Sequence, residues 1–310
     1  MILTVTLNPS VDIAYQFESF ETDTLNRPTL TRKTAGGKGL NVTRVLRTLG
    51  EDVKASGFLG GTNGEFILNE LRKTNVVTAF ESISEDTRNC IAILHEGRQT
   101  EILEKGPLIS HRDSALFKRN FGTLLNGCEA VVFSGSLPQG IDDTFYAELI
   151  EIAHASGITT VLDCSNAPLR KALKAEIKPD VIKPNIDELR NLLKREVSKE
   201  VSSLKAALLD ETFASVPWVI VSLGKDGCFA KHHNTFYLVT IPSIRVVNPV
   251  GSGDSTVAGI ASALVHNFED EALLKHANTL GMLNAMEAET GCVNLKNYDS
   301  LYKQIIVRKV

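Results

Sequence analysis

Hydrophobic residues along this chain follow two different spacings. Short apolar runs rich in β-branched residues predict buried parallel strands at residues 2–7, 129–135, 159–164, 180–185 and 218–224. Between and after these runs the apolar residues recur with helical spacing, which predicts helices at residues 64–74, 142–156, 187–194, 200–209, 254–266 and 270–288. Strand followed by helix, repeated along a chain, predicts an α/β fold with a mostly parallel sheet and helices on both of its faces.

Two segments depart from this pattern. Residues 13–20 and 88–106 alternate apolar and polar side chains, and the stretch HEGRQ in the second predicts a hairpin turn. Half-polar strands suit a small projecting sheet that acts as a lid or a subunit contact, and they also suit an edge extension without function. Because no Pro/Gly-rich linker divides the chain, we expect a single domain over residues 1–310, with lid strands inserted at about 11–35 and 86–106.

Composition narrows the function classes. The chain has 310 residues, 43% of them hydrophobic, with a net charge of -4, so it can bury a large core and lacks the basic face that nucleic-acid binding needs. No apolar run is long enough to predict a membrane partner, and MILTVTLNPSVD carries no basic leader, so we expect a cytoplasmic protein. Five dispersed cysteines without a C-x-x-C pair suggest neither a zinc site nor a disulfide framework.

A glycine-rich turn opens the predicted helix at 254–266. In NPVGSGDSTVAGI, residues 248–260, the amides of Gly251, Ser252 and Gly253 would form an anion cradle at the helix N-terminus. A bound phosphate would repel the carboxylate of Asp254, so a carboxylate at this position favours a catalytic role over simple phosphate binding. In that role Asp254 takes a proton from an incoming hydroxyl while the amides hold a transferring phosphoryl group. The helix end predicts a depressed pKa for this acid. A capped helix without catalytic role is the alternative.

A second glycine turn, AGGKGLN at residues 35–41, precedes an amphipathic helical stretch. Its glycines let the backbone approach a ligand, Lys38 supplies a positive charge and Asn41 can both donate and accept hydrogen bonds. This suits a polar ligand that carries a phosphate, although a simple tight turn would look similar. Neither the P-loop pattern nor the Rossmann G-x-G-x-x-G is present.

With these two turns, the chain resembles the ribokinase-like (PfkB) family of carbohydrate kinases over essentially its whole length. The family signatures correspond to GGKGLN and GSGD, and four further stretches occur in the family order: NPSVD, SGSLPQG, KPNIDE and VSLGKDG. The resemblance implies a ribokinase-like three-layer fold with a small β-sheet lid, ATP as co-substrate, Mg²⁺, and a homodimer joined through the lid sheets.

The resemblance also implies roles for individual residues. Asp254 would be the catalytic base, and Gly251, Ser252 and Gly253 the anion hole for the γ-phosphate. The sugar hydroxyls would be held by Asp12, Gly37 and Asn41. Asn185 and Glu188 form the N-x-x-E motif that positions magnesium and phosphate. The nucleotide side would comprise Lys183, Asn185, Ser222, Leu223, Gly224, Gly227 and Asn278.

Charged residues suggest the substrate. Arg27, Lys38 and Arg88 could together clamp a substrate phosphate, although each alone resembles a solvated surface charge. A lysine in the early turn resembles the sugar-phosphate branch of the family, which implies transfer of the ATP γ-phosphoryl group to O1 of D-tagatose 6-phosphate. The alternatives are the reaction on fructose 1-phosphate and a non-catalytic sugar-phosphate sensor, against which the joint presence of Asp254, Asn185 and Glu188 argues.

Overall fold

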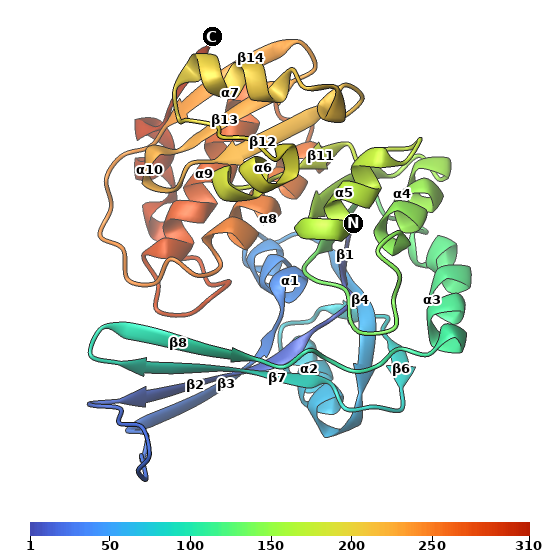
Figure 1. Ribbon diagram of the computed structural model, residues 1–310, viewed down its shortest axis with the longest axis vertical. Helices are drawn as coiled ribbons and strands as arrows, with labels where there is room; N and C mark the ends of the chain where they lie inside the picture. The colour runs from blue at the N-terminus through green and yellow to red at the C-terminus, as the bar shows by residue number, and fades with distance from the viewer.

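The computed structural model describes all 310 residues and contains two β-sheets (Figure 1). The larger sheet has eleven strands. In spatial order they are β15 (Ile306–Lys309), β14 (Thr235–Thr240), β13 (Cys228–His232), β12 (Trp218–Ser222), β11 (Val181–Ile182), β10 (Thr159–Asp163), β9 (Ala130–Ser134), β1 (Ile2–Thr6), β4 (Val53–Gly60) and β5 (Val77–Thr78), with β6 (Glu81–Ile83) also pairing with β4. The strands that run parallel are β12, β11, β10, β9, β1, β4, β5 and β6. Strands β13, β14 and β15 add an antiparallel edge. The expected mostly parallel α/β sheet is confirmed.

Helices cover both faces of this sheet. One face carries α3 (His111–Leu124), α4 (Phe145–Ala155), α5 (Asn166–Lys174), α6 (Ile186–Leu193) and α7 (Val201–Leu208); the other carries α1 (Lys38–Thr48), α8 (Ser252–Val265), α9 (Asp270–Ala285) and α10 (Tyr298–Gln304). Strand β1 shows why: Leu3 and Val5 belong to the first core and Ile2 to the second, as the alternation of a strand requires. None of the helices combines the length and apolar character that a bilayer crossing needs.

The smaller sheet projects from the body of the molecule (Figure 1). Its strand order is β3 (Leu30–Gly36), β2 (Ser10–Phe17), β7 (Arg88–His95) and β8 (Arg98–Leu103), with β2 and β7 parallel and both outer pairs antiparallel. The hairpin turn predicted within 88–106 is confirmed at Glu96 and Gly97, which both have positive φ. Helix α2 (Gly61–Lys73) shares a small core with this sheet through Ile67 and Leu71, which connects the sheet to the body.

Several elements differ from the sequence-based predictions. The predicted strand at 180–185 is reduced to Val181–Ile182, because Pro184 cannot donate a ladder hydrogen bond; a single parallel bridge joins Asn185 to Ser222 beyond it. Helices α3, α5 and α10, the parallel strands β4, β5 and β6 and the antiparallel strands β13, β14 and β15 were not predicted. Short strands carry a weak periodic signal, and pairing with neighbouring strands stabilises them.

Candidate active site

A cleft of about 1510 Å³ lies between the two sheets, at the carboxyl ends of the parallel strands. Ligands bind at this edge in open α/β sheets because the loops that follow the strands converge there. Both glycine turns contribute to its lining, as do β2, β7 and β8 of the small sheet. The structure thus brings most of the predicted residues together: Asp12, Gly37, Lys38, Asn41, Arg88, Lys183, Asn185, Glu188, Ser222, Gly251, Gly253 and Asp254 all line this cleft.

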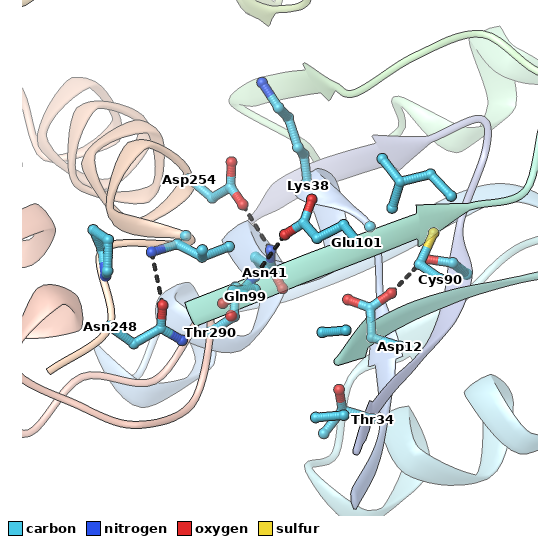
Figure 2. Close-up of a pocket in the computed structure, with 18 of the residues that line it drawn as sticks. Asp12, Thr34, Lys38, Asn41, Cys90, Gln99, Glu101, Asn248, Asp254 and Thr290 are labelled. Carbon is cyan, nitrogen blue, oxygen red and sulfur yellow. Dashed lines mark hydrogen bonds between the residues drawn. The ribbon is translucent and has the colours of Figure 1, made fainter. Parts of the chain in front are cut away.

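Asp254 lies in the first turn of α8 and is buried, with only 6% of its surface exposed. Its Oδ2 accepts a hydrogen bond of 2.6 Å from Nδ2 of Asn41, a residue 213 positions away in the sequence (Figure 2). Burial, and then the charge of Asp163, raise the pKa of Asp254 to about 6 against the opposing effects of Lys38, Asn41 and Lys183. The depressed pKa predicted from the helix end is therefore wrong, because desolvation outweighs the helix dipole.

Free amides surround this carboxylate. Gly251 caps α8 with a left-handed φ of 83°, a conformation that favours glycine. The Ser252 amide donates to the carbonyl oxygen of Pro249 at 3.3 Å, whereas the amides of Gly251, Gly253 and Asp254 have no acceptor within the protein. The Ser252 hydroxyl is buried and also lacks a partner. The turn can therefore donate three amide hydrogen bonds to an anion beside Asp254.

Asp163, at the end of β10, joins two lysines at this end of the cleft. Its Oδ1 lies 3.4 Å from Lys183 Nζ and its Oδ2 lies 3.4 Å from Lys38 Nζ. Burial opposes ionisation of Asp163, but the two ammonium groups hold its pKa below the usual value. The charge of Asp163 in turn raises the pKa of Lys38. The charge of Lys38 also acts on Asp254, and Lys38 is paired with Asp163 at this end of the cleft.

Sequence reasoning missed Asp163. A signal was present, because the predicted strand at 159–164 ends in this aspartate, and a carboxylate at the carboxyl end of a buried parallel strand points toward the ligand edge of the sheet. Lys183 is expected on the nucleotide side. Its Nζ lies close to Gly253: a Cβ added to that glycine would be 3.3 Å from Nζ. The structure thus places this lysine directly against the late glycine turn.

Asp12 and Arg88 lie on the small sheet. Oδ1 of Asp12 accepts a hydrogen bond of 2.6 Å from the Ser10 hydroxyl, and burial raises the pKa of this carboxyl. Arg88, the first residue of β7, donates to the carbonyl oxygens of Glu104 and Asn8 at 2.8 and 3.0 Å, and its Nε has no partner. In the view of Figure 2, Asp12 lies under the lid hairpin, apart from Asp254 and Lys38.

The N-x-x-E motif forms a capping box at the start of α6. Oδ1 of Asn185 accepts from the amides of Asp187 and Glu188 at 2.9 and 2.8 Å, and Oε2 of Glu188 accepts from the Asn185 amide at 2.9 Å. One carboxylate oxygen of Glu188 is left without a protein partner at the cleft. Nowhere do three His, Cys, Asp or Glu side chains gather as a metal site. This donor set fits Mg²⁺, which commonly takes one or two carboxylates and completes its shell with phosphates and water.

The turn after β12 is less involved in the cleft than the sequence predicted. Ser222 lines the cleft, whereas Leu223 is buried beneath it. Gly224 and Gly227 have φ values of 68° and 90° and do not line the cleft; a Cβ on Gly227 would lie 2.1 Å from the carbonyl oxygen of Val239. These two glycines shape a 3₁₀ turn, Gly224–Asp226, that supports the cleft from outside.

Two further predicted residues lie outside the cleft. Arg27 is exposed in the loop that joins β2 to β3 and does not line the cleft. Asn278 is buried in α9, where its amide donates to the carbonyl oxygen of Leu274 at 2.8 Å and to Cys228 Sγ at 3.3 Å. The sequence places Asn278 on a helix but does not show that its side-chain amide forms hydrogen bonds within the core.

Comparison with known proteins agrees with this architecture. The family model described as pfkB family carbohydrate kinase matches residues 5–295, and the chain belongs to this family. The tagatose-6-phosphate kinase of Staphylococcus epidermidis is 55% identical over 310 residues, which cover all of both chains.

Solved structures give the same result. The phosphofructokinase-2 of Escherichia coli in complex with fructose-6-phosphate superposes with a TM-score of 0.87 at 26% identity, over 97% of this chain and 98% of that one. The same enzyme in complex with potassium gives a TM-score of 0.89 at 26% identity, with the same coverage of both chains. The ribokinase-like fold expected from the sequence is confirmed.

Proposed function

We propose that this chain transfers the γ-phosphoryl group of ATP to O1 of D-tagatose 6-phosphate, which gives D-tagatose 1,6-bisphosphate and ADP. The observation that carries this proposal is the position of Asp254, a buried carboxylate between three unpaired amides and the polar pocket under the lid. A base and an anion hole on one helical turn are what phosphoryl transfer to an alcohol requires.

The chain's own residues account for the proton and the charge. The O1 oxygen forms a bond to the γ-phosphorus as the bond from that phosphorus to the β,γ-bridging oxygen breaks, and the O1 proton passes to Asp254. A pKa of about 6 leaves this carboxyl ionised at neutral pH and basic enough to accept the proton. The amides of Gly251 and Gly253, with Lys38 and Lys183, would stabilise the charge on the transferring group.

Magnesium would be held by Glu188 and Asn185 together with the phosphates of ATP. When bound, the ion neutralises phosphate charge and orients the nucleotide. The free carboxylate oxygen of Glu188 suits this role, and the capping box holds the side chain in place. Ser222 and Lys183 line the same part of the cleft and are proposed to contact the nucleotide.

The choice of sugar rests on the full-length similarity to a tagatose-6-phosphate kinase. Arg88, whose Nε is unpaired, is proposed to contact the sugar's own phosphate, whereas Lys38 lies beside Asp163 and Arg27 is exposed. Asp12 and Asn41 would hold the sugar hydroxyls. The rivals are phosphorylation of fructose 1-phosphate, with the sugar reversed, and binding without turnover.

A substrate panel tests the proposal. Initial rates of ADP formation are measured with tagatose 6-phosphate, fructose 6-phosphate and fructose 1-phosphate, each with ATP and Mg²⁺. We expect tagatose 6-phosphate to give the highest kcat/KM, with some activity on fructose 6-phosphate, which differs only at carbon 4. A strong preference for fructose 1-phosphate would overturn the choice of sugar, and no turnover with any of them would favour a sensor.

We also propose that the protein is cytoplasmic and that two copies pair through the small sheets. The projecting sheet exposes large apolar side chains, namely Leu25, Leu30, Ile102 and Leu103. Pairing of two copies would remove part of this apolar surface from water. Sedimentation velocity should show a dimer, and Ile102→Lys should shift it toward monomer. A monomeric wild type at assay concentrations would exclude the pairing.

A further inference from the structure

Arg44 lies on α1 behind the proposed base and takes no part in the mechanism described so far. Its guanidinium donates from Nη1 to the carbonyl oxygen of Ala35, and from Nη2 to Oδ1 of Asn41 and, at 3.0 Å, to the carbonyl oxygen of Thr290. The two carbonyl groups belong to β3 and to the loop after α9. They fix the guanidinium from two sides while Nη2 faces the amide of Asn41.

We propose that Arg44 is a positioning residue that holds the Asn41 amide with its nitrogen toward Asp254. An amide has an acceptor end and a donor end. With Oδ1 against the guanidinium, Nδ2 must face the carboxylate, which it contacts at 2.6 Å. The flipped amide would set N–H groups against the N–H groups of Arg44 and place an oxygen against a carboxylate oxygen, so both contacts would become repulsive.

Packing leaves the arrangement little freedom. A Cβ on Gly291 would lie 2.9 Å from Cα of Asn41 and 3.1 Å from Nη2 of Arg44, so the loop backbone presses on both residues. Gly291 has a φ of 68°, and its amide donates at 2.8 Å to Oδ1 of the buried Asn284. The loop that carries Thr290 is therefore anchored, and so is the guanidinium.

Charge supports the same role. The groups that act on Asp254 are Asp163 on β10, Lys38 and Arg44 on α1, and Lys183 before α6. Those that act on Arg44 are Asp12, Asp254, Cys292 and Glu289. Burial lowers the pKa of Arg44 and the carboxylates oppose this effect, so the guanidinium stays charged. It favours the ionised form of Asp254 through its charge and through the amide that it orients.

The inference rests on the proposed function, and a double-mutant cycle tests it. The variants are Arg44→Met, Asn41→Ala and the double variant, with Arg47→Met as the matched control. Arg47 lies one turn away on α1 and donates to the carbonyl oxygens of Glu51 and Thr74 outside the cleft. Rates are measured from pH 5 to 8 with the sugar phosphate that the wild type uses fastest, so the choice of sugar does not affect the result.

For Arg44→Met we expect kcat to fall about 10²-fold with little change in KM. The acid limb of kcat/KM should move to higher pH, which a merely structural role would not produce. Arg44→Lys should restore the limb toward its wild-type position because it keeps the charge. The double variant should lose far less than the product of the single losses, since Arg44 acts through Asn41. Arg47→Met should behave as wild type.

Multiplicative losses in the cycle, or an Arg44→Met variant with the wild-type pH profile, would overturn the inference. Thermal melting checks that each variant is folded, and if Arg44→Met does not fold, the cycle is run with Arg44→Gln, which also removes the charge. Asp254→Asn separates the two proposals. If it keeps full turnover, the proposed function fails, whereas an inactive Asp254→Asn beside multiplicative losses removes only the role of Arg44.

Discussion

The two glycine turns look alike in sequence, yet their glycines serve different purposes. In the early turn, a Cβ on Gly36 would lie 2.0 Å from Cγ of Asp12, and one on Gly39 would lie 2.2 Å from Oγ1 of Thr6. In the late turn, a Cβ on Gly253 would meet only the Lys183 side chain, with Nζ at 3.3 Å. The early glycines permit close backbone packing, whereas Gly253 leaves room for a ligand.

This difference separates stability from chemistry. Substitution in the early turn forces apart segments that pack within the protein, so it should lower the free energy of unfolding. Substitution of Gly253 in the late turn alters the surroundings of the proposed base and anion hole, so it should lower turnover in a protein that still folds. The following predictions test this contrast.

The largest effect is expected at Asp254. Asp254→Asn removes the group that accepts the proton and keeps the shape of the side chain, so kcat should fall by about 10²–10⁴-fold. ADP release measures the rate, and calorimetry should show that sugar-phosphate binding persists. A rate close to that of the wild type would show that the late turn is no more catalytic than the early one.

The wild-type pH profile should reveal the same group. Since the base acts only when ionised and its pKa is raised to about 6, kcat/KM should be highest above that value. Below it, activity should fall about tenfold per pH unit as Asp254 becomes protonated. The measurement is kcat/KM against pH at saturating ATP and Mg²⁺, with thermal melting to show that the fold persists. A flat profile through this range would contradict the assignment.

Glu188 separates capping from metal binding. Glu188→Gln keeps an acceptor for the Asn185 amide but loses the charge. We therefore expect the apparent affinity for Mg²⁺ to fall about 10- to 100-fold while the free energy of unfolding is retained. Glu188→Ala should show the same Mg²⁺ effect and also lose about 1 kcal/mol of unfolding free energy. Magnesium titration of the rate and chemical denaturation are the measurements. Equal stability of the two variants would remove the capping role.

The smallest effects sharpen the contrast between the turns directly. Gly39→Ala places a methyl group against Thr6 and should cost about 1–3 kcal/mol of unfolding free energy. Gly253→Ala lies within α8, where alanine is favoured over glycine, so stability should change by less than about 1 kcal/mol while kcat falls. Denaturant unfolding and initial rates, measured on the same preparations, give both quantities. The reverse pattern would contradict the comparison.

The sequence by itself was sufficient for the fold class, and most of the residues it proposed for the site line the cleft. Hydrophobic spacing is a local property, so the parallel sheet, the lid hairpin and the helices that follow could be predicted from it. The glycine turns and Asp254 could also be predicted, because a glycine-rich turn before a helix is likewise a local feature of the sequence. Family resemblance added Asp12, Asn185 and Glu188, whose motifs are short and whose order along the chain is itself a signal.

Only the tertiary structure decided how these residues act on one another. The raised pKa of Asp254, the pairing of Asp163 with two lysines and the contact of Arg44 with Asn41 all depend on segments far apart in the chain. Arg27 and Asn278 do not line the cleft, which their local sequence could not show for the same reason. Burial and charge compensation are set by what packs against a side chain, and local spacing does not contain that information.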